Sequence, residues 1–168
     1  MKKKSSLTAK DITLIGMMIA TLEAAKYALS FLPNVELVSF LIIVYTLFFG
    51  KRIFFALPVF ALLEGFLYGF GVWWVMYLYV WPLLAILVLL FRKQQSPYFW
   101  CLLSGMFGLF FGALCAIPYL FVSGIYGAVA WWIAGIPFDL IHAVSNFLLC
   151  LVLFTPMRKL FEKLHRWS

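Results

Sequence analysis

Residues 11–36 read DITLIGMMIATLEAAKYALSFLPNVE, and this stretch decides how the rest of the chain is organised. A helix of about 20 mostly apolar residues is long enough to cross the hydrocarbon core of a bilayer. The stretch follows a basic tail and ends in a polar corner that contains Pro33 and Asn34. It therefore predicts a first transmembrane helix over about residues 12–32.

Two features of this predicted helix go beyond those of a simple membrane anchor. Gly16, Ala20 and Ala24 recur at every fourth residue, so they form a narrow face on which a partner helix can pack closely. Glu23 and Lys26 are ionisable groups three residues apart inside the apolar run. They either neutralise each other on one helix face or belong to a site. The stretch thus predicts a membrane protein that binds a partner and a small molecule.

The composition predicts one integral membrane domain over residues 1–168. Of these residues 66% are hydrophobic and only 11% are charged, whereas about 25% are charged in soluble domains. No segment alternates with a period of two, and helices satisfy their own backbone groups in lipid. The predicted fold class is therefore an all-α integral membrane protein with six transmembrane helices and both termini cytoplasmic.

Turn and charge signals separate the six predicted helices. Gly50-Lys51-Arg52 ends the second span, Ser96-Pro97 is typical of a helix start, and residues 123–135 form the longest outer segment. The predicted spans are about residues 12–32, 35–50, 53–70, 72–91, 97–122 and 136–154, with cytoplasmic ends at 1–11 and 155–168.

The net charge of +7 indicates membrane topology rather than nucleic-acid binding. Apart from Lys26, the 13 Lys and Arg residues fall into four groups outside the predicted spans. Basic groups of this kind are retained on the cytoplasmic side. Both termini and the loops at Lys51 and Arg92 are therefore predicted to face the cytoplasm, with the protein in the cell membrane. The basic groups are Lys2, Lys3, Lys4 and Lys10; Lys51 and Arg52; Arg92 and Lys93; and Arg158, Lys159, Lys163 and Arg166.

Several small residues are interpreted as core packing, and no cofactor or metal is expected. Cys101, Cys115 and Cys150 all fall in apolar segments without metal-ligand spacing. Gly108, Gly112 and Ala116 form a stripe that is expected to pack inside the protein. A phosphate-binding loop is missing, because Gly50-Lys51-Arg52 lacks the upstream glycine and the following Ser or Thr. ATP-driven transport would therefore need a second chain.

Buried polar residues share one depth in the outer half of the predicted membrane. At about 1.5 Å of rise per residue, Glu64 and Asn146 lie roughly 18 Å from the cytoplasmic basic groups, and His142 lies roughly 24 Å from them. Ionisable residues inside a span are functional candidates by default. Glu64 lacks a local partner, so a ligand contact or a bridge to another helix is predicted for it. His142 and Asn146 are either ligand contacts or satisfied core groups, and Asp139 is expected to cap a helix N-terminus.

Aromatic residues also gather toward the predicted outer side, where they form an interfacial belt or the wall of a pocket. A pocket wall of this kind suits a flat, partly polar ligand. The outer aromatic residues are Tyr68, Trp73, Trp74, Tyr77, Tyr119, Tyr126, Trp131 and Trp132. The predicted substrate-binding residues are Asn34, Glu36, Glu64, Trp73, Trp74, Tyr77, His142 and Asn146.

The sequence resembles the S components of energy-coupling-factor (ECF) vitamin transporters. The resemblance is carried by the Gly16-Ala20-Ala24 face, by LPNVELVSFLIIVYTLFFG at 32–50 and by GIPFDLIHAVSNFLLCLVLFTPMRK at 135–159. It implies that the protein captures a vitamin or vitamin precursor from outside. A transmembrane T component and two ATPase subunits would then drive toppling and inward release. The resemblance also implies that the Gly16-Ala20-Ala24 face docks on the T component, with Gly16 in place of the first alanine of an Ala-x-x-x-Ala motif.

The resemblance leaves several substrates open, namely riboflavin, thiamin, biotin, folate, cobalamin, pyridoxine and pyrimidine precursors. The aromatic, lightly charged outer wall makes cobalamin or a related corrinoid the first choice, and a pyridoxine-like or hydroxymethylpyrimidine ligand the second. An ion-coupled secondary transporter and an intramembrane enzyme using Glu23, Glu64 and His142 are the alternatives. An enzyme would need paired groups such as His-Glu-x-x-His, which the sequence lacks, so a transport subunit without enzymatic activity is predicted.

Overall fold

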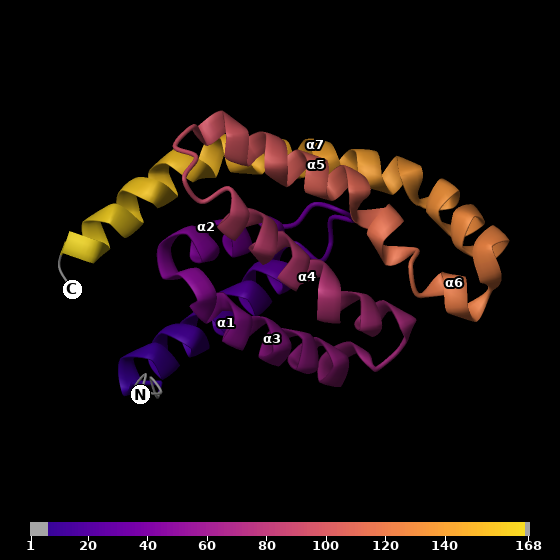
Figure 1. The fold of residues 1–168 in the computed structure, drawn as a ribbon, viewed down its shortest axis with the longest axis horizontal. Helices are drawn as coiled ribbons and strands as arrows, with labels where there is room; N and C mark the ends of the chain where they lie inside the picture. Colours follow the sequence, from indigo (N-terminus) through magenta and orange to yellow (C-terminus); the bar gives the residue numbers. More distant parts are fainter. Residues whose placement is uncertain (1–6, 167–168) are drawn as a thin grey trace.

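The structure, a computed structural model, describes residues 7–166, and its side chains are described for residues 7–164. Lys2, Lys3 and Lys4, and the side chain of Arg166, lie outside the described part, so their predicted cytoplasmic placement is not addressed by it. All regular elements between residues 7 and 166 are helical, without a strand (Figure 1). The predicted all-α class is therefore confirmed.

Seven α-helices and one 3-10 turn make up the described chain. Gly50 has a φ of 59°, a left-handed conformation that suits glycine, and turns the chain between the second and third helices. The elements are α1 (Ala9–Ala28), α2 (Val38–Phe49), η1 (Gly50–Arg52), α3 (Ile53–Tyr68), α4 (Val72–Leu90), α5 (Pro97–Cys115), α6 (Tyr119–Val122) and α7 (Gly124–Arg166).

Four helical segments in the described chain are long and apolar enough to cross a membrane. They mark the chain as a membrane protein, because a helix satisfies its own backbone groups in lipid. The 38–68 segment contains both α2 and α3. The four segments are Val38–Tyr68, Val72–Leu90, Pro97–Val122 and Gly124–Leu164.

The long helix α7 runs beside α5, and α1 to α4 pack on one side of this pair (Figure 1). The start of α1 and the end of α7 lie at the same end of the molecule, and α6 lies at the opposite end. The centre is filled by large apolar side chains from different helices, such as Phe40, Phe60 and Trp100, all of which are fully buried. Cys101, Cys115 and Cys150 are free and buried, as predicted.

Small residues on α5 let α7 approach closely. A Cβ atom built at Gly108 would lie 2.8 Å from the backbone oxygen of His142. At Gly112 a Cβ atom would overlap the carboxylate of Asp139. The predicted packing role of these two glycines is therefore confirmed, and it places polar residues of α7 against α5.

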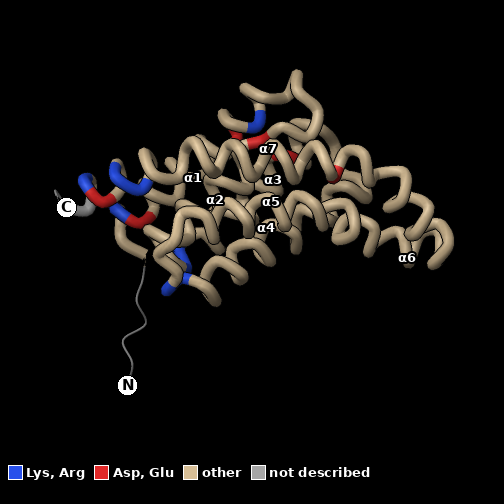
Figure 2. Tube along the Cα trace, turned by 90° about the horizontal axis from the view of Figure 1, so that it is seen from above, with Lys and Arg blue, Asp and Glu red and all other residues tan. Residues whose placement is uncertain are grey.

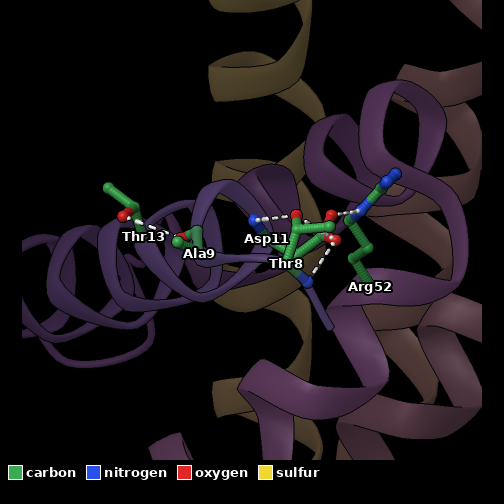
Figure 3. A network of polar contacts seen from close by, with 5 residues as sticks. All are labelled: Thr8, Ala9, Asp11, Thr13 and Arg52. Carbon is green, nitrogen blue, oxygen red and sulfur yellow. Dashed lines mark hydrogen bonds and ion pairs between the residues drawn. The ribbon is translucent and has the colours of Figure 1, made fainter. Parts of the chain in front are cut away.

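A polar network fixes the start of α1 (Figure 3). Thr8 and Asp11 form a reciprocal cap, in which Asp11 N donates to Thr8 Oγ1 (3.2 Å) and Thr8 N donates to Asp11 Oδ2 (3.1 Å). Arg52 Nε donates to Asp11 Oδ1 at 2.5 Å. The hydrogen bonds from Thr8, together with Arg52, lower the pKa of Asp11 to about 2. The network therefore ties α1 to the turn between α2 and α3.

Lys and Arg residues gather at the end of the molecule where α1 starts and α7 ends (Figure 2). Away from this group, about halfway along the molecule, basic and acidic positions lie close together. The end around α6 carries neither basic nor acidic residues. The described part of the molecule is therefore strongly asymmetric in charge along its length.

Two predicted helix boundaries are wrong. The last helix begins at Gly124 rather than near residue 136, and it continues through Pro137. The stacking of Trp131 on Tyr119 packs its first part against α6. The first helix ends at Ala28, four residues before the predicted end. The predicted fifth span of residues 97–122 has the bounds of the apolar segment Pro97–Val122, within which a turn after Cys115 separates α5 from α6.

We predict that Gly108→Ala destabilises the protein whereas Gly16→Ala does not. The added methyl group at Gly108 would press on the backbone of α7, and overpacking of this kind costs about 1–3 kcal/mol. At Gly16 nothing lies within 4 Å of the added atom, so only the better helix propensity of alanine remains. Thermal unfolding of both variants in detergent checks this. Equal melting temperatures would show that α5 and α7 are not in close contact.

Candidate ligand-binding site

The corner between α1 and α2 lies against α7. Ser145 Oγ donates a hydrogen bond to the backbone oxygen of Asn34 (2.9 Å), and Glu36 Oε1 lies 3.1 Å from His142 Nε2. Asn34 has a φ of 59°, a left-handed conformation that asparagine tolerates better than most residues. These contacts hold a polar stretch of backbone beside the middle of α7.

An outer cavity of about 370 Å³ lies under this corner. Its volume falls at the lower end of the range of about 300–1,000 Å³ found for small-molecule sites. Its wall combines the corner with side chains from α1, α3 and α4. The lining residues are Lys26, Leu29, Ser30, Leu32, Pro33, Asn34, Val35, Glu36, Tyr68 and Trp73.

A smaller inner chamber of about 130 Å³ lies deeper between α1, α2, α4, α5 and α7. Lys26, Asn34 and Glu36 line both cavities, so these three residues form the neck between them. The inner chamber is lined by Lys26, Asn34, Glu36, Val38, Tyr77, Trp81, Phe111 and His142.

Lys26 is held at the neck by four neighbours. Its ammonium group forms an ion pair with Glu64 of α3, which is 0% exposed, and donates a hydrogen bond to Tyr77 Oη at 3.0 Å. The rings of Tyr68, Trp73 and Tyr77 lie 5.2, 5.8 and 4.8 Å from Lys26 Nζ, within the range of cation–π attraction. A carboxylate in an apolar interior is strongly unfavourable unless it is paired. Glu64 therefore holds the ammonium group of Lys26 in place, and Lys26 offsets the free-energy cost of burying the Glu64 carboxylate.

Aromatic rings continue along α4 from the outer cavity to the inner chamber. Tyr77 meets Trp73 edge to face at 5.4 Å and Trp81 at 5.3 Å. Trp81 lies 5.5 Å from Phe111 of α5, and Phe111 meets the ring of His142 at 4.8 Å. A flat ligand would thus find aromatic walls in both cavities, with the Lys26 and Glu36 charges at the neck between them.

The structure brings most of the predicted site residues together. Asn34, Glu36, Trp73, Tyr77 and His142 line the cavities, and Glu64 reaches them through Lys26.

Two predicted residues lie elsewhere. Trp74 Nε1 donates to the backbone oxygen of Ala61 at 2.7 Å and lines neither cavity. Asn146 is buried one turn beyond His142 and lines neither cavity, and its side-chain amide lacks a hydrogen-bond partner among the described residues. Trp74 therefore supports the α3–α4 contact instead of facing a ligand.

Two interpretations of the charged residues are corrected. Lys26 pairs with Glu64 rather than with Glu23, and Glu23 Oε1 is buried without a hydrogen-bond partner in the described chain. Asp139 does not cap a helix N-terminus, because α7 begins fifteen residues earlier at Gly124. Instead, Asp139 Oδ1 accepts a hydrogen bond from the backbone N–H of Gly112 at 2.9 Å. Both partners come from other helices, so local spacing did not reveal them.

Sequence reasoning missed the place of Lys26 at the neck and the parts played by Trp81 and Phe111. Lys26 is the only basic residue inside a long apolar segment. This position marks it as a candidate functional residue but does not show which residue it pairs with. Trp81 and Phe111 are aromatic residues in runs of apolar residues, and nothing in their spacing separates a cavity wall from ordinary core. Their contribution depends on how α4 and α5 pack.

The function of this site has to be argued from its geometry. No family model, no curated protein and no solved structure matches the chain. The site is small, has aromatic walls and lies beneath a polar corner. Its charged and polar groups are Lys26, which is paired with Glu64, and Glu36, which contacts His142. Such a site can bind a small, flat, polar molecule in the interior of an apolar helical bundle.

We predict that the Lys26–Glu64 pair contributes to stability as a unit. Lys26→Met leaves a buried carboxylate without its partner, which costs about 3–5 kcal/mol. The double variant Lys26→Met/Glu64→Gln removes both charges, so it should be more stable than Lys26→Met alone. Unfolding in detergent of the two single variants and the double variant gives the coupling energy.

The exposed pair of Arg158 and Glu162 provides the matched control, because surface ion pairs contribute about 0–1 kcal/mol. Additive effects of Lys26→Met and Glu64→Gln would contradict the proposed coupling.

Proposed function

We propose that this protein is the S component of an ECF-type transporter, the subunit that captures a vitamin or vitamin precursor from outside the cell. The observation that carries this proposal is the pair of cavities beneath the corner at residues 29–37, which share Lys26, Asn34 and Glu36 in their walls. They lie inside an apolar bundle, away from the basic end of the molecule. A site in this position is accessible from one side of the membrane, as capture from outside requires.

The proposed topology has six spans with both ends cytoplasmic. Gly50 divides the 38–68 segment into α2 and α3, and α1, α4, α5 and α7 supply the other four spans. The basic residues gather at the end where α1 starts and α7 ends, which supports a cytoplasmic location for that end. The 43 residues of α7 measure about 65 Å, more than twice the hydrocarbon thickness, so α7 extends beyond the bilayer.

The proposed partner surface is the small-residue face of α1. Gly16, Ala20 and Ala24 are all exposed, and the space beside Gly16 is open. A helix of the T component could approach this face closely and gain dispersion contacts. Two ATPase subunits complete the proposed complex, since the chain itself lacks a phosphate-binding loop.

The size of the cavities favours the second choice of substrate over the first. A corrinoid macrocycle with its nucleotide is several times larger than an outer cavity of about 370 Å³. A pyridoxine-like or hydroxymethylpyrimidine ring fits that volume. The ion-coupled alternative is less well supported, because the buried carboxylate of Glu64 is already neutralised by Lys26.

We predict that substitutions on the small-residue face of α1 abolish partner binding without affecting ligand binding. Gly16→Leu combined with Ala20→Leu should abolish co-purification with a T component and uptake by cells, because the bulk prevents close approach. The isolated variant should still retain the small molecule that mass spectrometry identifies in the wild-type protein purified from rich medium.

The paired changes Leu102→Ala and Met106→Ala, on the exposed face of α5, serve as the control and should leave assembly intact. Normal assembly of the Gly16→Leu/Ala20→Leu variant would remove this face from the mechanism. A wild-type protein that carries no small molecule and binds no vitamin would overturn the proposed function.

The proposed topology predicts that residue 95 faces the cytoplasm and residue 123 faces outward. In a background without Cys101, Cys115 and Cys150, a cysteine at Gln95 should resist an impermeant thiol reagent in intact cells. A cysteine at Ser123 should react. Equal labelling at the two positions would refute the arrangement, and labelling after lysis controls for accessibility of the thiol.

A further inference from the structure

The inner chamber contains two polar groups whose hydrogen-bonding capacity is unused. Trp81 and His142 both line it, and both are at least 96% buried. Trp81 Nε1 and His142 Nδ1 lack a hydrogen-bond partner among the described residues. Buried polar atoms in proteins are nearly always paired, so two unpaired ones at the wall of one chamber point to a molecule that pairs with them.

The chemistry of the two groups is complementary. An indole N–H can only donate a hydrogen bond. Glu36 Oε1 lies 3.1 Å from His142 Nε2, and a carboxylate can only accept a hydrogen bond, so a neutral imidazole here carries its proton on Nε2 and offers Nδ1 as an acceptor. The side chains that line the chamber therefore include one with an unpaired donor, Trp81 of α4, and one with an unpaired acceptor, His142 of α7. A matching molecule must carry an acceptor for Trp81 and a donor for His142.

The volume and walls of the chamber restrict the shape of that molecule. About 130 Å³ suits one six-membered ring, and the aromatic side chains of Tyr77, Trp81 and Phe111 provide apolar walls for its faces. The carboxylate of Glu36 at the neck disfavours an anionic group beside it. Larger substituents would extend through the neck into the outer cavity.

We propose that the inner chamber binds the ring of a single-ring nitrogen heterocycle that carries a ring-nitrogen acceptor and an exocyclic amino or hydroxyl donor. The ring nitrogen accepts from Trp81 Nε1, and the exocyclic group donates to His142 Nδ1. Glu36 sets the tautomer of His142 and is thus a positioning residue for this recognition. The inference rests on the proposed function and narrows its substrate to one chemical class.

The experiment is calorimetric titration of the purified full-length protein with four probes, namely hydroxymethylpyrimidine, pyridoxine, cobalamin and benzyl alcohol. Benzyl alcohol has a ring of similar size without ring nitrogens. We expect at least one of the two heterocycles to bind, and to bind at least tenfold more tightly than benzyl alcohol. Trp81→Phe keeps an aromatic wall but removes the donor, so it should weaken heterocycle binding about tenfold. Benzyl alcohol binding should not change.

The control variant is Trp131→Phe, which changes a tryptophan that lies outside both cavities. It should bind all probes as the wild type does. The inference is overturned if Trp81→Phe binds the heterocycle with unchanged affinity. Should Trp81→Phe fail to fold, the wild-type comparison still decides, because benzyl alcohol binding as tightly as the heterocycles would also overturn it.

The result separates this inference from the proposed function. Tight binding of cobalamin, with neither heterocycle bound, would overturn the inference and leave vitamin capture standing. If a heterocycle binds and Trp81→Phe does not weaken its binding, the inference is likewise overturned and vitamin capture still stands. Failure of all four probes, together with the absence of any co-purified small molecule, would overturn both.

Discussion

The ion pair between Lys26 and Glu64 is the interaction on which the site depends. Glu64 is fully buried in α3, and a lone carboxylate there would be strongly unfavourable. Its partner comes from α1, so the two helices have to pack in one register for both charges to be accommodated. The same contact places an ammonium group at the neck between two cavities, surrounded by Tyr68, Trp73 and Tyr77.

A second constraint joins the corner at residues 29–37 to α7. Glu36 meets His142, and the backbone of Asn34 accepts from Ser145. His142 reaches this position because Gly108 lets α7 lie directly on α5. Small residues on one helix therefore decide where a polar residue of another helix stands. The contact between Glu36 and His142 therefore depends on the close packing of α7 against Gly108 of α5.

The proposed recognition uses groups that the fold leaves unpaired. Trp81 of α4 and His142 of α7 line one chamber that is too small for a macrocycle, and each has a polar atom without a hydrogen-bond partner among the described residues. Lys26, by contrast, is fully engaged by Glu64 and Tyr77. The site thus combines a charge that is already satisfied with a donor and an acceptor that are not, which suits a neutral heterocycle better than an ion.

The sequence by itself determined the membrane class, the helical fold and the candidate polar residues, because these follow from local composition and from the cost of charge in lipid. Apolar length, basic groups and isolated ionisable residues can all be read along the chain. Pairing could not be read, because Lys26–Glu64 and Gly112–Asp139 join residues that are far apart in sequence. Only the tertiary structure decided these partners, the place of Trp81 in a cavity wall and the exclusion of Trp74 from it. The physical reason is that the rotation and register of packed helices decide which side of a helix meets a cavity. Nearly all sides of these helices are apolar, so the sequence does not show which side that is.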